Sequence, residues 1–345
     1  MKKVVIRVDS SAMIGSGHLM RCLTLAKQLE KNDGADVRFI SRNLDGSVHD
    51  LIRRQGFELS LLPRHELDPS LEGYAQWLTV PQTVDAEETV EILKSIQPVD
   101  QLVVDSYAID ITWETVVRPF VKNIFVIDDL ANRRHDCDVL LDQNFHLDLS
   151  ARCEQYRRLV PPHCDLRIGL KYVLLRAEFY DAKKHLRRRD ESIKNILVFY
   201  GGVDLTNETM KALRALTILN LPDVVVNVVV GAGNANQKSV EEYCARHGFN
   251  YLYQVDNMAE LMNAADLALG AGGTTTWERC FLGLPTVLTA IADNQKSGAE
   301  LETAGYVVYL GKAQDCTEET IVRAVKGLTK ERLLQIQDRC LKIWE

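Results

Sequence analysis

Short apolar runs rich in β-branched residues alternate with longer amphipathic stretches along most of the 345-residue chain. Such alternation is typical of parallel sheets whose strands are joined by crossover helices. In the first half we predict strands at residues 4–8, 37–41, 102–105, 124–127 and 139–141, and helices at 18–30, 46–55, 85–96 and 112–121. The pattern therefore predicts the α/β fold class.

The same alternation begins again after a polar stretch over residues 144–190. The strands predicted in this second half are 196–200, 224–230, 251–254, 267–269, 286–288 and 307–310. One or two charged amphipathic helices over 318–343 close the chain. We therefore predict a Rossmann-like domain over residues 1–165, a second one over 166–325, and a closing helix over 326–345 that could cross back to the first domain.

Open parallel sheets bind their ligands beyond the carboxyl ends of their strands. Two such sheets that face each other form a cleft lined by strand-to-helix loops. We therefore expect the binding and catalytic residues in those loops.

Composition narrows the classes of function. Apolar residues make up 46% of the chain and charged residues 26%, which is ordinary for a water-soluble globular protein. The first residues form a strand rather than a signal sequence, and no later segment is a continuous apolar span, so we expect a cytoplasmic location without membrane insertion. The net charge of -7 argues against nucleic-acid binding, and we interpret the basic run over residues 183–189 as a solvated linker.

The cysteine and acidic patterns do not indicate a metal site. Eight cysteines are scattered without a CxxC pair, so we expect reduced thiols rather than a zinc ribbon or a dithiol redox site. Asp136, Cys137 and Asp138 imitate a metal-binding DxD motif, but they precede a strand and no third ligand is near them. We expect no metal and no cofactor.

The first loop with candidate chemistry is DSSAMIGSGHLMR, residues 9–21, which leaves the first strand and enters the first helix. Gly15 and Gly17 allow close approach of the backbone to a ligand, and the helix N-terminus presents open amides. The helix dipole there disfavours imidazolium, so His18 is expected to be neutral and able to accept a proton as a general base. The alternative is that His18 only packs or caps the first turn. The spacing is not the GxGxxG pattern of dinucleotide-binding proteins.

Two loops of the second half could hold a phosphate and a sugar. Residues 201–204, GGVD, follow a strand, although a Gly-Gly pair is also common in turns. In residues 266–278, DLALGAGGTTTWE, a strand ends in small residues and three hydroxyls open a helix, which suits a pyrophosphate held without a metal. Glu278 lies on the same helix face as Thr274 and could accept the hydroxyls of a ribose. The alternative is that Thr274 is an N-cap and Glu278 a surface acid.

Other polar groups follow predicted strands. Residues 293–295, DNQ, come after the strand at 286–288, where Gln295 could reach the phosphate or the sugar or be an ordinary cap. Residues 105–107, DSY, and residues 128–129, DD, are further candidates to line the cleft.

Together these segments resemble a known family. The motifs, in chain order, are DSSAMIGSGHLMRCLTLA, VVDSYAID, VIDDLANRRHDCDVLLDQN, LLRAEF, YGGVD, DNMAELMNAADLALGAGGTTTWE and DNQ. They look like the UDP-2,4-diacetamido-2,4,6-trideoxy-β-L-altropyranose hydrolases of pseudaminic acid biosynthesis, which are relatives of the UDP-GlcNAc transferase MurG. The resemblance runs from Lys3 to about Tyr309, and the loop around His18 is its most specific part.

The resemblance implies a GT-B fold, with two Rossmann-like domains facing across a cleft, and metal-independent hydrolysis of a UDP-sugar with inversion at the anomeric carbon. It assigns His18 as the catalytic residue, Tyr107 as a cleft tyrosine and Glu278 as the ribose-binding acid, and it puts backbone atoms at Met258 against the uracil. The other candidate substrate-binding residues are Ser11, Gly15, Gly17, Arg21, Gly202, Asp204, Gly273, Thr274, Thr275, Asn294 and Gln295.

The sequence departs from the family pattern at two places, and the first of them leaves the contacts with the phosphates open. Residues 272–274, GGT, stand where serines often occur, and Ser106 stands where some members carry histidine. Two other functions also remain open: a GT-B glycosyltransferase that uses a UDP-amino-sugar donor, and a catalytically silent nucleotide-sugar-binding protein. In each case the expected partner is a small UDP-sugar, without nucleic acid, and the expected state is a monomer or a weak oligomer.

Overall fold

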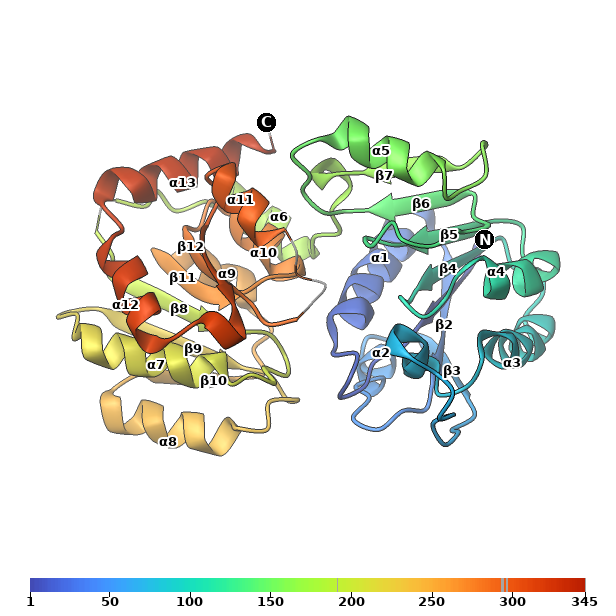
Figure 1. Cartoon of the computed structure of the whole chain (residues 1–345), viewed down its shortest axis with the longest axis horizontal. Helices are drawn as coiled ribbons and strands as arrows, with labels where there is room; N and C mark the ends of the chain where they lie inside the picture. The colour runs from blue at the N-terminus through green and yellow to red at the C-terminus, as the bar shows by residue number, and fades with distance from the viewer. Residues whose placement is uncertain (191, 293–294, 296, 345) are drawn as a thin grey trace. The chain divides into compact units, whose positions relative to one another are not determined.

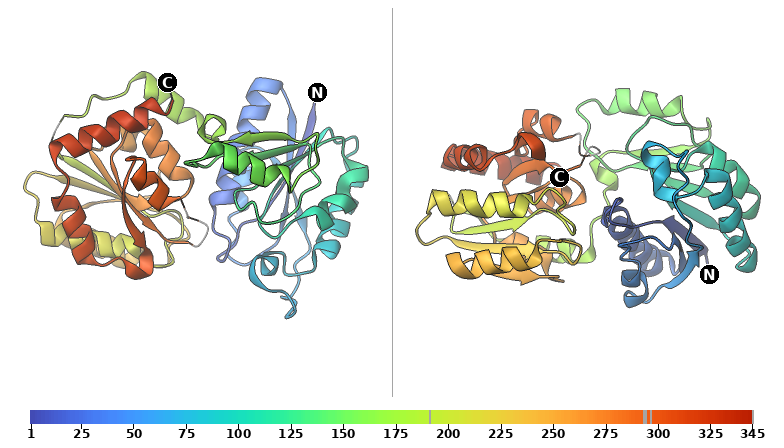
Figure 2. Two further views of the ribbon diagram at one scale, coloured as in Figure 1. Left: turned by 45° about the horizontal axis from the view of Figure 1, so that its top comes forward. Right: turned by 60° about the horizontal axis from the view of Figure 1, so that its bottom comes forward.

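The computed structural model describes residues 1–190, 192–292, 295 and 297–344. It consists of two compact units, Met1–Leu174 and Leu175–Glu345, which we call the N-terminal unit and the C-terminal unit. Each unit has its own parallel sheet between layers of helices, as Figure 1 and Figure 2 show. The predicted α/β class with two Rossmann-like domains is confirmed.

The sheet of the N-terminal unit has seven strands in the order β3-β2-β1-β4-β5-β6-β7. The strands are β1 (Lys3–Val8), β2 (Asp36–Arg42), β3 (Glu58–Leu62), β4 (Gln101–Asp105), β5 (Ile124–Ile127), β6 (Val139–Asp142) and β7 (Asp165–Ile168). The α-helices are α1 (Gly17–Asp33), α2 (Asp50–Arg54), α3 (Gln82–Ser95), α4 (Ile111–Val117) and α5 (Leu149–Arg157), and the 3₁₀ turns are η1 (Gly73–Leu78), η2 (Arg118–Phe120) and η3 (Leu170–Tyr172).

The central strand β1 is buried on both faces. Val4, Ile6 and Val8 pack with α1 and α2, while Val5 packs on the opposite side with α3, α4 and α5. Burial on both faces explains why this strand is a continuous apolar run in the sequence, without alternation.

Two strands of this sheet, β3 and β7, escaped the sequence-based prediction. Both lie at sheet edges and most of their residues are partly exposed, so neither carries a continuous apolar run. Because β7 pairs in parallel with β6, the first unit extends to Leu174 rather than to the expected boundary at residue 165.

The sheet of the C-terminal unit has six strands in the order β10-β9-β8-β11-β12-β13. The strands are β8 (Asn195–Phe199), β9 (Val225–Val230), β10 (Asn250–Tyr253), β11 (Leu267–Ala271), β12 (Thr286–Ala290) and β13 (Val308–Lys312). The α-helices are α6 (Ala177–Lys184), α7 (Glu208–Leu219), α8 (Gln237–His247), α9 (Met258–Ala264), α10 (Thr274–Phe281), α11 (Gly298–Thr303), α12 (Glu318–Lys326) and α13 (Lys330–Lys342), and the 3₁₀ turn η4 spans Ala313–Asp315.

The interpretation of the basic run as a solvated linker was wrong for Arg187 and Arg189. Arg187 forms an ion pair with Asp266, and Arg189 is only 4% exposed. The guanidinium of Arg189 donates to carbonyl oxygens at the ends of α9 and α10, those of Met262, Ala265, Leu282 and Gly283. Burial lowers the pKa of Arg189 to about 10. Carbonyls at helix C-termini carry partial negative charge, which offsets the cost of burying this cation.

The closing helix α13 packs within the C-terminal unit. Ile336 and Cys340 form a small core with Cys280 of α10, and the Leu341 side chain lies close against Gly283. The expected return of this helix to the first domain stays a prediction.

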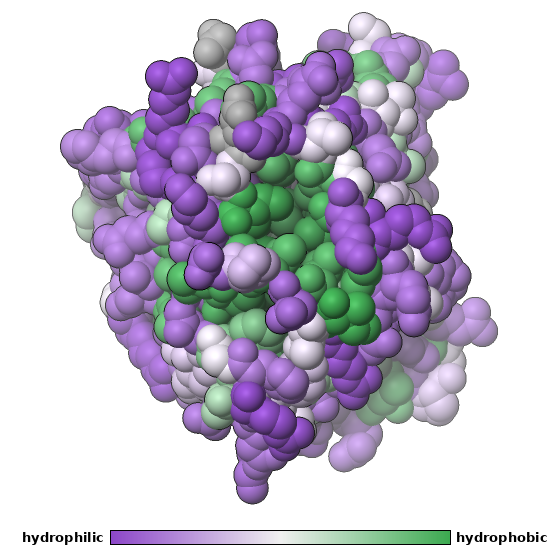
Figure 3. Space-filling model, turned by 90° about the vertical axis from the view of Figure 1, so that its left-hand side faces the viewer, coloured by the Kyte–Doolittle hydropathy of each residue, from purple (hydrophilic) through white to green (hydrophobic). Residues whose placement is uncertain are grey.

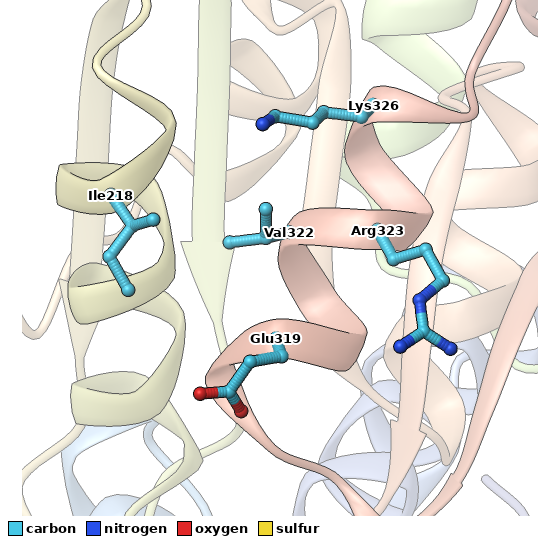
Figure 4. Close-up of a pocket in the computed structure, with 5 residues that line it drawn as sticks. All are labelled: Ile218, Glu319, Val322, Arg323 and Lys326. Atoms are coloured by element: carbon cyan, nitrogen blue, oxygen red, sulfur yellow. The ribbon is translucent and has the colours of Figure 1, made fainter.

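An apolar groove marks the surface of the C-terminal unit. It holds about 330 Å³ between α7 and α12, where Ile218 and Val322 line it together with charged side chains (Figure 4). Figure 3 shows apolar side chains gathered on the side of the molecule that lies to the left in Figure 1. The groove lies between two helices and away from the strand-to-helix loops, so it is not the candidate site.

Candidate functional site

In the N-terminal unit the strand order changes direction between β1 and β4. The loops that follow these two strands therefore lead away in opposite directions from the carboxyl edge of the sheet, and this is the place where doubly wound sheets bind ligands. His18 enters from the loop after β1, as the second residue of α1, and Asp105 is the last residue of β4. The two residues meet: Nδ1 of His18 lies 2.6 Å from Oδ1 of Asp105.

This contact determines which nitrogen of His18 can act as a base. Nδ1 also lies 3.1 Å from Nη2 of Arg21, which can only donate, but the carboxylate of Asp105 is closer and only accepts, so we assign the Nδ1–H to the bond with Asp105. The lone pair then lies on Nε2, which hydrogen-bonds to no other described residue. Asp105 holds His18 in the tautomer and orientation that a general base needs.

Arg21 forms a buried clamp on the same carboxylate, and its expected contact with substrate stays a prediction. Its Nε and Nη2 donate to the two oxygens of Asp105, each at 2.6 Å, and its Nη1 lies 3.1 Å from Asp129. Burial alone would lower the pKa of Arg21, but Asp105 and Asp129 hold it well above its usual value. Burial likewise would raise the pKa of Asp105, yet Arg21 and His18 hold it far below its usual range. The geometry gives Arg21 a positioning role.

Two aromatic rings contact the imidazole, and a third packs against both of them. Tyr107, whose hydroxyl donates to Asp129 at 2.5 Å, meets the His18 ring edge-on with centroids 4.7 Å apart. Trp77 lies 5.5 Å from His18, and Tyr74 contacts both Trp77 and Tyr107. Sequence reasoning found Tyr107 but missed Tyr74 and Trp77, which η1 carries; two aromatics three positions apart were the available signal.

The other candidates of the first loop shape its backbone. The Ser11 hydroxyl accepts the amides of Met13 and Ile14, and the Ser11 carbonyl accepts the amide of Gly15, whose φ is 79°. Gly17 begins α1, and the N-cap residue before it makes no side-chain cap hydrogen bond. These contacts hold the loop in a tight turn ahead of His18.

In the C-terminal unit the strand order changes direction between β8 and β11, and both expected loops follow these strands. The loop after β8 packs closely on the loop after β9. A Cβ on Gly231, which directly follows β9, would lie 2.5 Å from the Cα of Gly202. The two carboxylate oxygens of Asp204 accept the amides of Glu208 and Thr209 at 2.9 and 3.0 Å. Asp204 thus caps α7, and its contact with substrate stays a prediction.

The loop after β11 opens α10. Gly273 precedes the helix with a φ of 96°, a backbone conformation that favours glycine. The hydroxyls of Thr274 and Thr275 in the first turn make no hydrogen bond to another described residue. Oε1 of Gln295 accepts the amide of Ile291 at 2.9 Å. Asn294 lies outside the described residues.

Glu278 lies one turn further along α10 and is 3% exposed. Its Oε1 accepts a hydrogen bond from Nε of Arg176 at 2.9 Å, while Oε2 is buried and has no hydrogen-bond partner among the residues that the structure describes. Burial raises the pKa of Glu278 in spite of Arg176. The reading as a surface acid was wrong, because the side chain is buried, and the orphaned oxygen leaves an acceptor for a ligand hydroxyl.

Met258 begins α9 and is buried. The amide of the next residue, Ala259, donates to Oε2 of Glu178 at 3.3 Å. The expected backbone contact with uracil at Met258 stays a prediction.

Within the residues that the structure describes, no group of three His, Cys, Asp or Glu side chains is placed to hold a metal ion. None of the described helices is both long enough and apolar enough to span a membrane.

Two doubly wound parallel sheets define the class of protein, an α/β fold of the GT-B type. Solved structures agree: Acinetobacter baumannii MurG has a TM-score of 0.62 at 15% identity, covering 99% of this chain and 95% of that one. Phytolacca americana UGT2, solved with UDP-2-fluoro-glucose and pterostilbene, has a TM-score of 0.70 at 14% identity, covering 99% and 94%. A cleft between the two domains stays a prediction.

The resemblance seen in the motifs is confirmed at the level of whole chains. The chain is 28% identical over 310 residues to the UDP-2,4-diacetamido-2,4,6-trideoxy-β-L-altropyranose hydrolase of Campylobacter jejuni, covering 89% of this chain and 98% of the relative. Residues 195–340 match the glycosyltransferase family 28 C-terminal domain.

Proposed function

We propose that this chain hydrolyses a UDP-linked 2,4-diacetamido-2,4,6-trideoxy sugar to UDP and the free sugar, as a step of pseudaminic-acid-type biosynthesis. The observation that carries the proposal is the His18–Asp105 pair at the switch point of the N-terminal sheet, with Nε2 left as a proton acceptor. Similarity to the C. jejuni hydrolase along 89% of the chain supports it.

The proposed reaction needs one base and a firm hold on the leaving group. Water gives a proton to Nε2 of His18 while its oxygen attacks the anomeric carbon from the face opposite UDP. The bond from that carbon to the β-phosphate oxygen breaks, and its electron pair leaves with UDP, so the configuration inverts. Asp105 stabilises the imidazolium that forms. Because UDP leaves readily as an anion, no second carboxylate is needed to protonate it.

In this proposal the C-terminal unit holds UDP. The amides at the start of α10 and the hydroxyls of Thr274 and Thr275 bind the pyrophosphate without a metal. The ribose hydroxyls bind Glu278, and the uracil meets the backbone near Met258. The buried oxygen of Glu278 without a partner supports a ligand hydroxyl at this position.

The test is incubation of the purified chain with the UDP-sugar and no acceptor. We expect UDP and reducing sugar in equal amounts, with product of inverted configuration seen by NMR. Replacing His18 by Ala or Asn should lower turnover by about 10²-fold or more, the range for loss of a general base, and change UDP affinity only a few-fold. Turnover that survives the substitution would show that His18 is not the base.

A glycosyltransferase is the second candidate, favoured by the match of residues 195–340 to a glycosyltransferase C-terminal domain. It would transfer the sugar from UDP to an acceptor hydroxyl through the same two units. If UDP release begins only when an acceptor is added, the hydrolase proposal is rejected and the transferase replaces it.

A further inference from the structure

Arg176 connects two acidic residues of the C-terminal unit that come from different elements. Its Nε donates to Glu278 on α10 at 2.9 Å, and its Nη1 lies 2.6 Å from Oε1 of Glu178 on α6. The guanidinium also stacks on the ring of Phe179, 4.9 Å from its centroid. Three contacts of different kinds fix the position of this cation.

Glu278 depends on that cation for its charge. Burial penalises the ionised carboxylate and raises its pKa, whereas Arg176 and, more weakly, Arg279 lower it. Glu178 opposes them as a like charge. The Arg279 guanidinium on the same helix donates to the carbonyl of Ala271 and the hydroxyl of Thr276, so Arg176 is the cation that contacts the carboxylate directly.

Glu178 extends the connection to α9. Its Oε2 accepts the amide of Ala259 in the first turn of that helix, while its Oε1 is paired with Arg176. A single chain of contacts therefore runs from the first turn of α9 through Glu178 and Arg176 to Glu278.

We propose that Arg176 is a positioning residue for the nucleoside: it keeps Glu278 ionised and oriented for the ribose hydroxyls and ties it to the first turn of α9. The inference rests on the proposed function, which assigns the ribose to Glu278. An ionised carboxylate offers acceptors to both ribose hydroxyls, whereas a protonated one keeps a hydrogen of its own and accepts less well.

The test measures UDP and 2′-deoxy-UDP affinities by titration calorimetry between about pH 5.5 and about pH 8.5, on the full chain. The two ligands share the same phosphate titration, so their affinity ratio reports on the ribose hydroxyl alone. In Arg176→Gln, we expect the preference for UDP to be retained at high pH and lost as pH falls, with a midpoint about one pH unit above that of the parent chain. Arg176→Lys should restore the parent profile, because a cation is again present.

The controls separate this role from a merely structural one. Arg214→Gln removes a more exposed arginine that pairs with Glu318 in the same unit, and should leave the ratio unchanged. In a Glu278→Gln background, Arg176→Gln should cause no further shift.

Two outcomes overturn the inference while UDP still binds. Either the ratio in Arg176→Gln follows the parent profile, or both ligands lose affinity equally at every pH, as expected for a phosphate contact. If the parent chain binds neither ligand, the proposed function itself fails.

Discussion

A single carboxylate, Asp105, contacts two basic side chains at the carboxyl end of β4. The imidazole of His18 and the guanidinium of Arg21 both contact its Oδ1, and Arg21 also takes Oδ2. The positive charge of Arg21 compensates the buried negative charge of Asp105, and Asp105 orients the imidazole ring of His18. The proposed base is therefore part of a three-residue unit rather than an isolated side chain.

Asp105→Asn should abolish most of the turnover. The amide can present its NH₂ group to Nδ1 and so favour the tautomer whose Nε2 is protonated, and a fall in kcat of about 10²- to 10⁴-fold is expected for such a loss. UDP affinity, measured by calorimetry, should stay within a few-fold. Asp129→Asn is the matched control, because Asp129 contacts Arg21 and Tyr107 but not His18, and its kcat should fall far less.

Arg21→Met should destabilise the N-terminal unit. It leaves the buried carboxylate of Asp105 without its main counter-charge, which typically costs about 3–5 kcal/mol. Urea unfolding followed by circular dichroism measures the loss. The exposed pair of Arg53 and Asp50 supplies the control, since Arg53→Met should change the free energy of unfolding by less than about 1 kcal/mol. Equal losses in the two variants would contradict a buried clamp.

The ionised side chain of Glu278 should lower the free energy of unfolding at neutral pH. Its pKa in the folded chain is raised by burial, so the contribution of this group is complete below the unfolded pKa, near 4, and is lost as pH rises through the folded pKa. Glu278→Gln should therefore raise the free energy of unfolding at pH 7 and leave it unchanged near pH 4. Glu154→Gln, at an exposed position of α5, should have little effect at either pH. A lower free energy of unfolding for Glu278→Gln than for the parent chain at pH 7 would contradict this expected increase.

At the scale of elements, the loop after β8 has two structural roles, close packing and helix capping, which its sequence does not distinguish from ligand binding. Its glycines allow close packing against Gly231, and its aspartate, Asp204, caps α7 through two backbone amides. A Gly-Gly-x-Asp loop has the same composition whether its carboxylate meets a helix or a ligand.

Asp204→Ala should distinguish the two roles. Loss of an N-terminal cap lowers stability by about 1–2 kcal/mol, seen as a lower midpoint in urea, while UDP affinity should change little. A fall in UDP affinity of more than about tenfold at unchanged stability would instead make Asp204 a ligand contact.

The sequence predicted the central elements and the loops at both switch points, because buried parallel strands and glycine-rich turns leave strong local patterns. It did not predict β3 and β7, whose edge positions remove that pattern. It also interpreted Arg187 and Arg189 as solvated, and it did not predict that Arg21 pairs with Asp105. The partners of these three side chains lie more than 70 positions away in sequence, at Asp105, Asp266 and the ends of α9 and α10, and periodicity does not reveal them.

At the scale of the whole molecule, each unit has a complete core of its own. The C-terminal unit buries its own set of apolar residues around β8, β11 and α7, and it carries Thr274, Glu278 and Arg176. The proposed function therefore places nucleotide binding and proton transfer in different units.

Residues 175–345 expressed alone should therefore fold and bind UDP within about tenfold of the full chain, without hydrolysing the UDP-sugar. Calorimetry and a UDP-release assay measure the two properties. Residual hydrolysis by this half would contradict the assignment of the base to His18. The half-chain carrying Glu278→Gln is the control for specific binding.

The rings that enclose His18 have a consequence for how the reaction begins. Tyr107 and Trp77 flank the imidazole, and Asp105 fixes its Nδ1, so the ring has little freedom to turn towards an approaching molecule. Misplacement by about 1 Å at a reacting centre can cost a factor of about 100 in rate. If His18 is the base, as proposed, the substrate must bind with its reacting centre already aligned to Nε2, because the imidazole is held in one orientation.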